Sequence, residues 1–215
     1  MSTLFHDRVD AGRALAAALA QHDLGEAVVV GLARGGVAVA AEVARALSLP
    51  LDALAVRKIG YPRQPEYGIG AVTPGPGGVY LRSDEGLDED ELSRAIAKAK
   101  AEAETLDAVI HARCRRAELG GRTAVLVDDG LATGATMVAA VCWARAQGAA
   151  RVVVGVPVGA AESARLLRLE ADEVVCPYEQ RHFGAVGFWY GSFAQVETDE
   201  VVALLEDLGV PASAG

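Results

Sequence analysis

The sequence predicts an α/β fold built on a doubly wound, mostly parallel β-sheet. Short Val-rich runs alternate along the chain with Ala- and Leu-rich segments of helical spacing, which is typical of βαβ units. The candidate strands are apolar on both faces, so helices have to cover both sides of the sheet. The chain has 215 residues, of which 52% are hydrophobic, and we expect one domain over residues 1–215.

The expected elements follow one another in a regular order. The chain opens with an amphipathic helix, because Asp7, Asp10 and Arg13 interrupt its apolar run at helical spacing. The candidate strands are the β-branched runs at 27–31, 51–56, 123–127, 151–156 and 173–176. The helices between them are expected near 36–47, 135–147 and 160–169.

Two segments interrupt this alternation. Residues 60–81 are dense in Gly and Pro, which predicts a long loop followed by a hairpin that turns at 74–78. Residues 87–119 predict a long, charged, Ala-rich helix with acidic residues at its start and arginines near its end. This helix could pack across the core, cap a site or form a dimer face.

Composition excludes several classes of partner. The formal net charge of −9 argues against a non-specific binder of nucleic acid or of an anionic membrane surface. No segment approaches the ~18 uncharged apolar residues that a transmembrane helix needs. Cys114, Cys142 and Cys176 lie far apart without metal-ligand spacing, so we expect reduced thiols in a cytoplasmic protein.

The most informative segment is VLVDDGLATGATM, residues 125–137. Asp128 and Asp129 follow an apolar strand, at the edge of a parallel sheet where ligands bind. The next residues, 131–136, open a helix, so their N–H groups and two threonine hydroxyls can converge on a phosphate. The aspartates can accept hydrogen bonds from vicinal hydroxyls or hold a hydrated Mg²⁺. A phosphate beside a diol indicates a ribose 5-phosphate. A helix start capped by Asp and Thr would explain one of these polar residues only.

This motif resembles the phosphoribosyl-diphosphate (PRPP) binding motif of the type I phosphoribosyltransferases. The resemblance implies a Mg²⁺-dependent transferase that moves the phosphoribosyl group of PRPP to a nitrogenous base and releases diphosphate. It also implies that the long helix at 87–119 is an insertion and that residues 178–208 form a small C-terminal hood. In this family Asp128 and Asp129 would hold the ribose hydroxyls, and also the metal, directly or through water. The 5-phosphate would lie on Ala132, Thr133, Gly134, Ala135 and Thr136.

Two further segments resemble the family's diphosphate site. In GLARGG, residues 31–36, Arg34 with Gly35 and Gly36 would contact the leaving group, and several relatives hold a non-proline cis peptide there. Arg57 and Lys58 resemble a catalytic basic pair that binds diphosphate, and residues 60–81 stand where the family has a flexible loop. GLARGG also fits a plain strand-to-helix turn, and Arg57 with Lys58 also fits a solvated strand end. The dinucleotide fingerprint G-x-G-x-x-G and the P-loop lysine are absent from GLARGG.

The acceptor is only partly indicated. Ala132 stands where 6-oxopurine phosphoribosyltransferases carry an aspartate, which disfavours a hypoxanthine or guanine acceptor. The motif is closer to that of adenine phosphoribosyltransferases, but the loop and the C-terminal segment differ from theirs. The whole chain resembles a bacterial group without an assigned acceptor. Within 181–193 the aromatic residues could stack a base, or close a core or an oligomer interface; they are Phe183, Phe188, Trp189 and Tyr190.

Two other functions remain open at this point. A PRPP-sensing regulator would keep the fold without transferase activity, since fold alone does not fix function. A nucleotide-sugar or dinucleotide enzyme on a Rossmann core would bind NAD(P) instead of PRPP. For the transferase we expect small-molecule partners, PRPP and a base-like acceptor, without nucleic acid or membrane, in a cytoplasmic homodimer.

Overall fold

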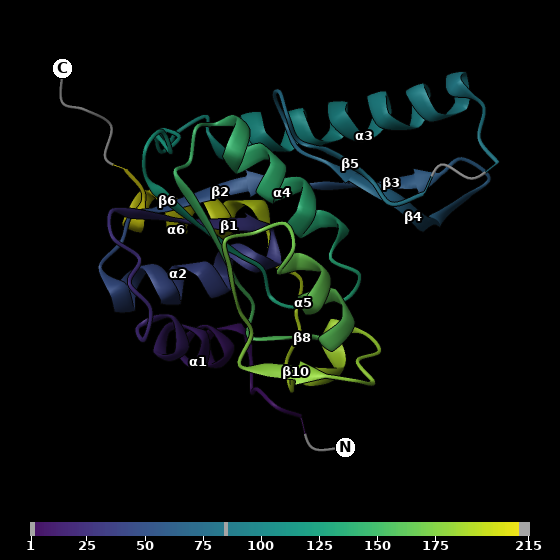
Figure 1. Ribbon diagram of the computed structural model, residues 1–215. Helices are drawn as coiled ribbons and strands as arrows, with labels where there is room; N and C mark the ends of the chain where they lie inside the picture. Colours follow the sequence, from purple (N-terminus) through teal and green to yellow (C-terminus); the bar gives the residue numbers. More distant parts are fainter. Residues whose placement is uncertain (1–2, 84–85, 211–215) are drawn as a thin grey trace.

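The computed structural model describes residues 3–83 and 86–210, and a five-stranded parallel sheet forms its centre (Figure 1). The strands lie in the order β2-β1-β6-β7-β9. Their bounds are β1 Ala27–Ala33, β2 Leu51–Ala55, β6 Thr123–Val127, β7 Arg151–Gly155 and β9 Glu173–Val175. The predicted α/β fold and its five candidate strands are therefore confirmed. The order reverses direction between β1 and β6, and this switch point is where open α/β sheets bind their ligands.

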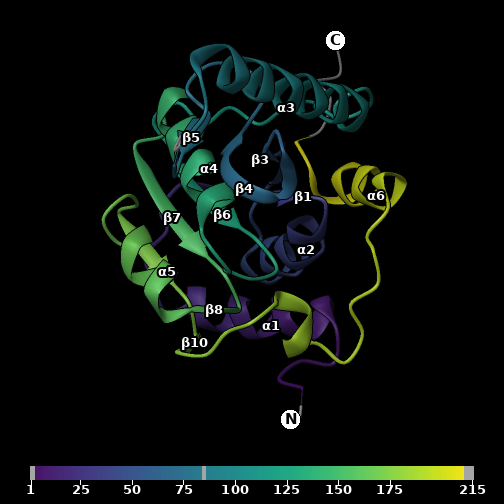
Figure 2. The same ribbon diagram turned by 90° about the vertical axis from the view of Figure 1, so that its right-hand side faces the viewer.

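Helices cover both faces of the sheet, as the doubly wound fold requires (Figures 1 and 2). Helices α1 (Arg8–Leu19) and α2 (Gly35–Leu47) pack together on one face, and α4 (Ala135–Ala146) covers the other. Helix α5 (Ala161–Leu167) follows β7 through a short strand.

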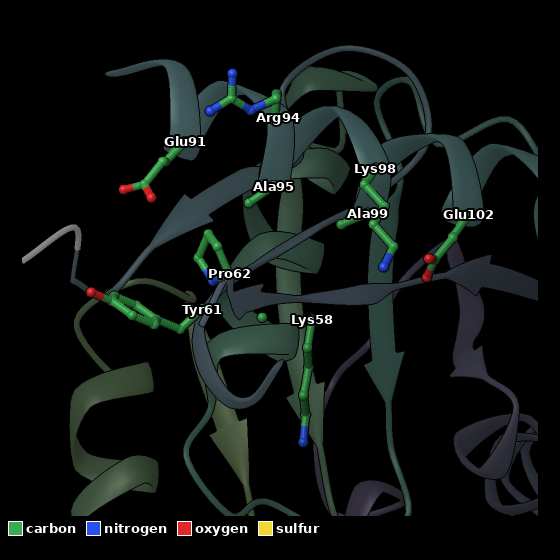
Figure 3. A pocket seen from close by; sticks show the side chains of 10 residues that line it. Lys58, Tyr61, Pro62, Glu91, Arg94, Ala95, Lys98, Ala99 and Glu102 are labelled. Carbon is green, nitrogen blue, oxygen red and sulfur yellow. The ribbon is translucent and has the colours of Figure 1, made fainter. Parts of the chain in front are cut away.

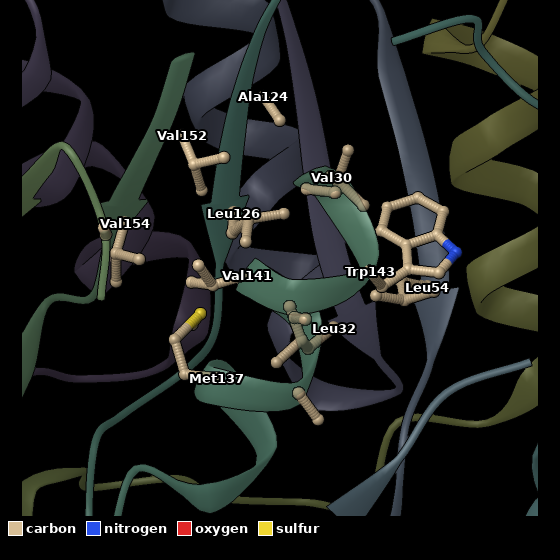
Figure 4. Close-up of a cluster of buried hydrophobic side chains, with 14 of the residues drawn as sticks. Val30, Leu32, Leu54, Ala124, Leu126, Met137, Val141, Trp143, Val152 and Val154 are labelled. Carbon is tan, nitrogen blue, oxygen red and sulfur yellow. The ribbon is translucent and has the colours of Figure 1, made fainter. Parts of the chain in front are cut away.

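The face under α4 is a dense apolar layer (Figure 4). Met137, Val141 and Trp143 of α4 pack on a cluster that includes Val30 of β1 and Val154 of β7. All five side chains are at least 98% buried. Since each buried side chain of this size stabilises a fold by ~1.5–3 kcal/mol, this layer holds β6 and the start of α4 firmly in place.

The segment expected as a loop and a hairpin is a three-stranded antiparallel sheet. It consists of β3 (Arg57–Tyr61), β4 (Gln64–Val72) and β5 (Val79–Leu81). The turn predicted at 74–78 is present, closed by the Thr73 N–H, which donates to the Gly78 carbonyl at 2.8 Å. The preceding part pairs as a hairpin instead of forming a loop, because its apolar residues Ile59 and Ile69 are buried under α3.

The inserted helix α3 spans Glu89–Ile110, so it ends before residue 119, where the sequence had predicted its end. It begins at a capping box in which Asp88 accepts from the Glu91 N–H. Beyond Ile110 the chain leaves the helix because it turns toward Asp52, a buried carboxylate of β2. His111 Nε2 lies 2.9 Å from Asp52 Oδ1, and the Ala117 N–H donates to Asp52 Oδ2 at 3.0 Å.

The C-terminal third divides into two parts. Strands β8 (Val158–Ala160) and β10 (Tyr178–Gln180) form a small parallel sheet, and the 3₁₀ helix η1 (Val186–Trp189) lies beside it. Helix α6 (Thr198–Leu208), which the sequence placed in the hood, packs on β2 and α2 instead, well apart from β8 and β10 (Figure 2). The apolar residues Val201 and Leu205 explain this position, because they complete the core on that face. Across the described residues, no helix has the length and apolarity needed to cross a membrane.

Candidate active site

The site is formed by the two loops that leave β1 and β6 at the switch point. These strands are neighbours in parallel register, with Gly31 opposite Val127. Their carboxyl ends therefore lie at one edge of the sheet, and the predicted loops that begin at Arg34 and Asp128 emerge side by side there.

Glycines allow the two loops to touch. A β-carbon at Gly35 would lie 2.3 Å from Asp129 Oδ2, and one at Gly36 would lie 2.8 Å from Asp128 Oδ1. Both distances are below van der Waals contact. A larger residue at Gly35 would displace the Asp129 carboxylate, and one at Gly36 would also meet the Val127 carbonyl at 2.7 Å and so push the loops apart. The peptide bond between Ala33 and Arg34 is cis, the feature that the family resemblance had suggested for this loop.

The loop after β6 has the form of an anion-binding helix start. Gly134 takes a left-handed conformation with φ +80° and leads directly into α4. Within the described structure, no side chain caps this helix, so its first N–H groups point outward without a side-chain acceptor. The loop is anchored by Ser163, whose hydroxyl donates to the Ala132 carbonyl at 2.6 Å. Ala132 and Thr133 are exposed at its rim and Thr136 is half-buried.

The aspartate pair lies in a low-dielectric position. The Asp129 N–H donates to Asp128 Oδ1 at 2.9 Å, which fixes the first carboxylate. Burial raises the pKa of Asp128 well above its usual value, and the neighbouring charge of Asp129 raises it further. Burial also raises the pKa of Asp129, against the opposing effect of Arg8. Two carboxylates held in this state favour a ligand that brings hydroxyl donors or positive charge.

Arg8 is a site residue that the sequence did not indicate. It is the first residue of α1, and its Nε donates to Asp129 Oδ2 at 2.9 Å while Nη2 lies 2.8 Å from the same oxygen. Its Nη1 donates to the Ala194 carbonyl at 2.6 Å. A single arginine on an amphipathic helix carries no local signal of this contact, because it joins residues 121 positions apart.

The aromatic segment, residues 181–193, contacts the loop that carries the aspartate pair. Tyr190 is buried, and its hydroxyl donates to the Asp129 carbonyl at 2.5 Å. Burial raises the pKa of Tyr190, so its phenol stays protonated as a donor. Phe183 and Trp189 stack on each other with their ring centroids 5.8 Å apart, whereas Phe188 is 75% exposed. Most of these aromatics therefore pack internally, and Phe188 alone of the four presents most of its surface to solvent.

The predicted basic pair points in two directions. Lys58 and Arg57 are neighbours on β3, so their side chains leave opposite faces of the strand. The charge of Lys58 lowers the pKa of Asp128, which places Lys58 within electrostatic reach of the aspartates. Arg57 lines a separate groove of about 780 Å³ between α3 and the start of α6.

A second, smaller cavity beside the hairpin has no aspartate in its lining. This cavity of about 470 Å³ is bounded by β3, the turn after it and the first half of α3 (Figure 3). The Lys58 side chain extends away from α3, whereas Lys98 reaches from the helix toward the strand (Figure 3). Lys58 thus lines the cavity, but its ammonium group points away from α3.

Arg34 lies at the edge of the site and is 30% exposed. Its Nη1 is 3.4 Å from Glu197 Oε2, an exposed carboxylate at the start of α6. This contact is long and solvent-accessible, so it holds Arg34 only weakly and leaves the guanidinium available to an anionic ligand.

The aspartates suit a hydrated divalent cation in their chemistry. Carboxylate oxygens are the ligands that Mg²⁺ prefers, and this ion usually keeps several waters and binds through one or two carboxylates plus substrate oxygens. Across residues 3–83 and 86–210, no group of three or more His, Cys, Asp or Glu side chains is arranged to hold a metal. Asp128 and Asp129 could therefore supply part of a coordination shell that a phosphorylated substrate completes.

Comparison with known proteins decides the family. The sequence model of the family described as "Phosphoribosyl transferase domain" matches residues 3–188. The chain belongs to this family. The phosphoribosyl transferase match covers both switch-point loops, the inserted helix and most of the aromatic segment.

Two similar proteins extend along most of this phosphoribosyl transferase domain. Protein TT1426 of Thermus thermophilus, a crystal structure, is 40% identical with a TM-score of 0.81, covering 96% of this chain and 99% of that one. The Mycobacterium tuberculosis protein Rv0571c, provisionally named a phosphoribosyl transferase, is 47% identical over 208 residues. That match covers 94% of this chain and 46% of the relative, so the chain spans about half the length of the curated relatives it matches.

A more distant structure shares the fold alone. Protein AQ2163 of Aquifex aeolicus is 13% identical with a TM-score of 0.50, covering 80% of this chain and 73% of that one. Within the phosphoribosyl transferase domain described above, the loops at 34–36 and 128–136 meet, the charge of Lys58 acts on the pKa of Asp128, and Arg57 lines a separate groove.

Proposed function

We propose that the chain binds PRPP together with Mg²⁺ and transfers its phosphoribosyl group to a nitrogenous base, with release of diphosphate. The observation that supports this most is the meeting of two loops at the switch point of the sheet. One loop brings paired carboxylates beside an uncapped helix start, and the other places Gly35 and Gly36 directly against those carboxylates. A diol, a 5-phosphate and a diphosphate each find a chemically matched partner there.

The 5-phosphate would be held by the start of α4. The N–H groups of Gly134, Ala135 and Thr136 and the hydroxyls of Thr133 and Thr136 are suited to a dianion, and the helix dipole adds to the attraction. Ala132 has no polar side chain, so its side chain would only shape the phosphate site and would donate no hydrogen bond.

The ribose hydroxyls would donate to Asp128 and Asp129. As the bond between C1 and the diphosphate oxygen breaks, its electron pair leaves with diphosphate and positive charge grows on the sugar. Two carboxylates in a low-dielectric position stabilise that charge more strongly in the transition state than in the ground state. The acceptor nitrogen forms a new bond to C1 and gives up its proton to the departing diphosphate or to solvent, which completes the transfer.

The leaving group would be met by cations from the loop after β1 and from β3. Arg34 and Lys58, with the N–H groups of Gly35 and Gly36, would take up the charge of the diphosphate. Mg²⁺, when bound through Asp128, Asp129 or their waters, supplies further charge neutralisation of the diphosphate. Fixing both ends of PRPP aligns C1 with the acceptor, which is catalysis by orientation.

A diphosphate-release assay tests the proposal. Purified protein is incubated with PRPP, Mg²⁺ and a panel of purine bases, pyrimidine bases and other amines. We expect one class of acceptor to raise release well above the acceptor-free rate, and the Asp128→Asn, Asp129→Asn double variant to abolish the increase. Tight PRPP binding without release for any acceptor would support a sensor instead, and protection of the protein by NAD(P) but not by PRPP would contradict both.

A further inference from the structure

We propose that Arg8 is a positioning residue for the ribose-binding carboxylate, and that it links the aromatic segment to the loop after β6. The inference rests on the proposed function, since the ligand concerned is the ribose 5-phosphate part of PRPP. It adds a residue from the first helix to a site otherwise built from the loops that follow β1 and β6.

The contact between Arg8 and Asp129 selects one carboxylate oxygen. Nε and Nη2 both approach Asp129 Oδ2, at 2.9 and 2.8 Å, and the two side chains are only 12% and 14% exposed. Both Arg8 nitrogens approach Oδ2, so the contact does not engage Asp129 Oδ1. Arg8 therefore fixes the rotation of the carboxylate and leaves one of its oxygens for a ligand hydroxyl.

Arg8 is itself held from two other sides. Its guanidinium carbon lies 3.9 Å from the centroid of the Phe193 ring, and Nη1 donates to the Ala194 carbonyl. A planar guanidinium that stacks on a ring and donates in two further directions has little freedom left. Its position is thus set by the end of the aromatic segment and the residue that follows it.

The backbone before Arg8 is joined to the same segment. The Phe5 N–H donates to the Trp189 carbonyl at 3.0 Å, and the Gly191 N–H donates back to the Phe5 carbonyl at 2.8 Å. Asp7 then starts α1 by accepting from the Asp10 N–H at 2.9 Å. These bonds place Arg8, the first residue of α1, next to Asp129.

The loop after β1 completes the arrangement. A β-carbon at Gly35 would lie 3.1 Å from Arg8 Nη2 as well as 2.3 Å from Asp129 Oδ2. Arg8 thus lies where the loop of the proposed diphosphate site, the proposed diol site and the aromatic segment meet. An ion pair with a purely structural role would stabilise the fold, whereas a positioning residue also changes the affinity for one part of the ligand selectively.

Binding measurements on Arg8→Gln separate these roles. Dissociation constants are measured by calorimetry for ribose 5-phosphate and, separately, for inorganic diphosphate with Mg²⁺. We expect ribose 5-phosphate to bind about tenfold more weakly or worse, since a charge-assisted contact is lost, and diphosphate to bind within about twofold of wild type. Arg8→Lys should recover part of the ribose 5-phosphate affinity, because the charge returns without the planar fork.

Arg13→Gln is the matched control. Arg13 lies on the same helix, is 73% exposed and pairs with Glu42 at 3.3 Å, so both affinities should stay at the wild-type value. Phe193→Leu keeps the Arg8 charge but removes its stacking ring, and an intermediate loss for ribose 5-phosphate is expected. This variant and Arg8→Lys keep the test decisive if Arg8→Gln does not fold.

Two results would overturn this inference without overturning the proposed function. Either Arg8→Gln binds ribose 5-phosphate as well as wild type, or it loses both ligands in parallel with a fall in Tm. A wild-type protein that binds no ribose 5-phosphate would instead overturn the proposed function, and the inference would fall with it.

Discussion

Gly35 lies so close to Asp129 that a β-carbon on the glycine would stand 2.3 Å from the Oδ2 atom of the aspartate. The two residues belong to the loops after β1 and β6, which are distant in sequence. Their approach makes one continuous site out of two loops, and it constrains what each position tolerates.

Gly35→Ala should therefore damage the site. We expect the methyl group to displace the Asp129 carboxylate, to lower the free energy of unfolding by about 1–3 kcal/mol and to weaken ribose 5-phosphate binding. Gly120→Ala is the control, because a β-carbon there would meet no atom within 4 Å. Urea denaturation and calorimetry measure both quantities, and equal behaviour of the two variants would refute the close contact.

Asp128→Asn should separate stability from binding. Because burial raises the pKa of Asp128, its ionised form is disfavoured in the folded state, and this cost is present at neutral pH. We expect the asparagine variant to be as stable as wild type or more stable by up to about 1 kcal/mol, yet to bind ribose 5-phosphate poorly. Marked destabilisation with intact binding would show that the carboxylate serves the fold instead of the ligand.

Arg34 and Glu197 should have opposite effects on diphosphate. Arg34→Ala should weaken diphosphate binding more than ribose 5-phosphate binding, since the guanidinium lies on the loop after β1. Glu197→Gln removes the competing carboxylate 3.4 Å away, so diphosphate affinity should rise by about two- to fivefold, the size expected for an exposed ion pair. Equal losses for both ligands in Arg34→Ala would argue against a role at the leaving group.

His111 should make stability depend on pH above neutrality. Burial alone lowers the pKa of His111, but its contacts with Asp107 and Asp52 outweigh burial and raise the pKa from 6.5 to about 9. Since the folded-state pKa is the higher one, the stabilisation is fully present below about pH 6.5 and is lost as the pH rises through about 9. Arg116 is the cation that opposes this shift.

The comparison with His111→Gln checks this. We expect wild type to exceed the variant in free energy of unfolding by about 1–3 kcal/mol near pH 6, with the difference shrinking toward about pH 10. His22→Gln serves as a control histidine that contacts Glu173 at the other side of the sheet. A difference that does not change with pH would contradict an imidazolium at residue 111.

Sequence reasoning succeeded where chemistry is local. The order of strands and helices follows from hydrophobic periodicity, and the strand end, loop and helix start around DDGLATGAT follow from the same local pattern. In both cases the residues that determine the structure are neighbours in the chain. The glycines of GLARGG were also predicted at a ligand loop, and their contact with the aspartates gives them a steric reason.

Longer-range features were missed for a common reason. Arg8 reaches Asp129 only because segments from both ends of the chain meet. The Arg57 side chain points away from the site because Arg57 and Lys58 are neighbours on β3 and their side chains leave opposite faces of the strand. The long helix ends at Ile110 because His111 turns inward to a carboxylate on a different element. None of these contacts leaves a periodic or compositional trace in the local sequence.

A structure of the protein with ribose 5-phosphate and Mg²⁺ tests the central claim most directly. We expect density for the phosphate at the start of α4, over residues 133–136, with the ribose hydroxyls against Asp128 and Asp129. The same ligand bound in the groove beside Arg57, in the cavity under α3, or at any place away from residues 128–136 would contradict it.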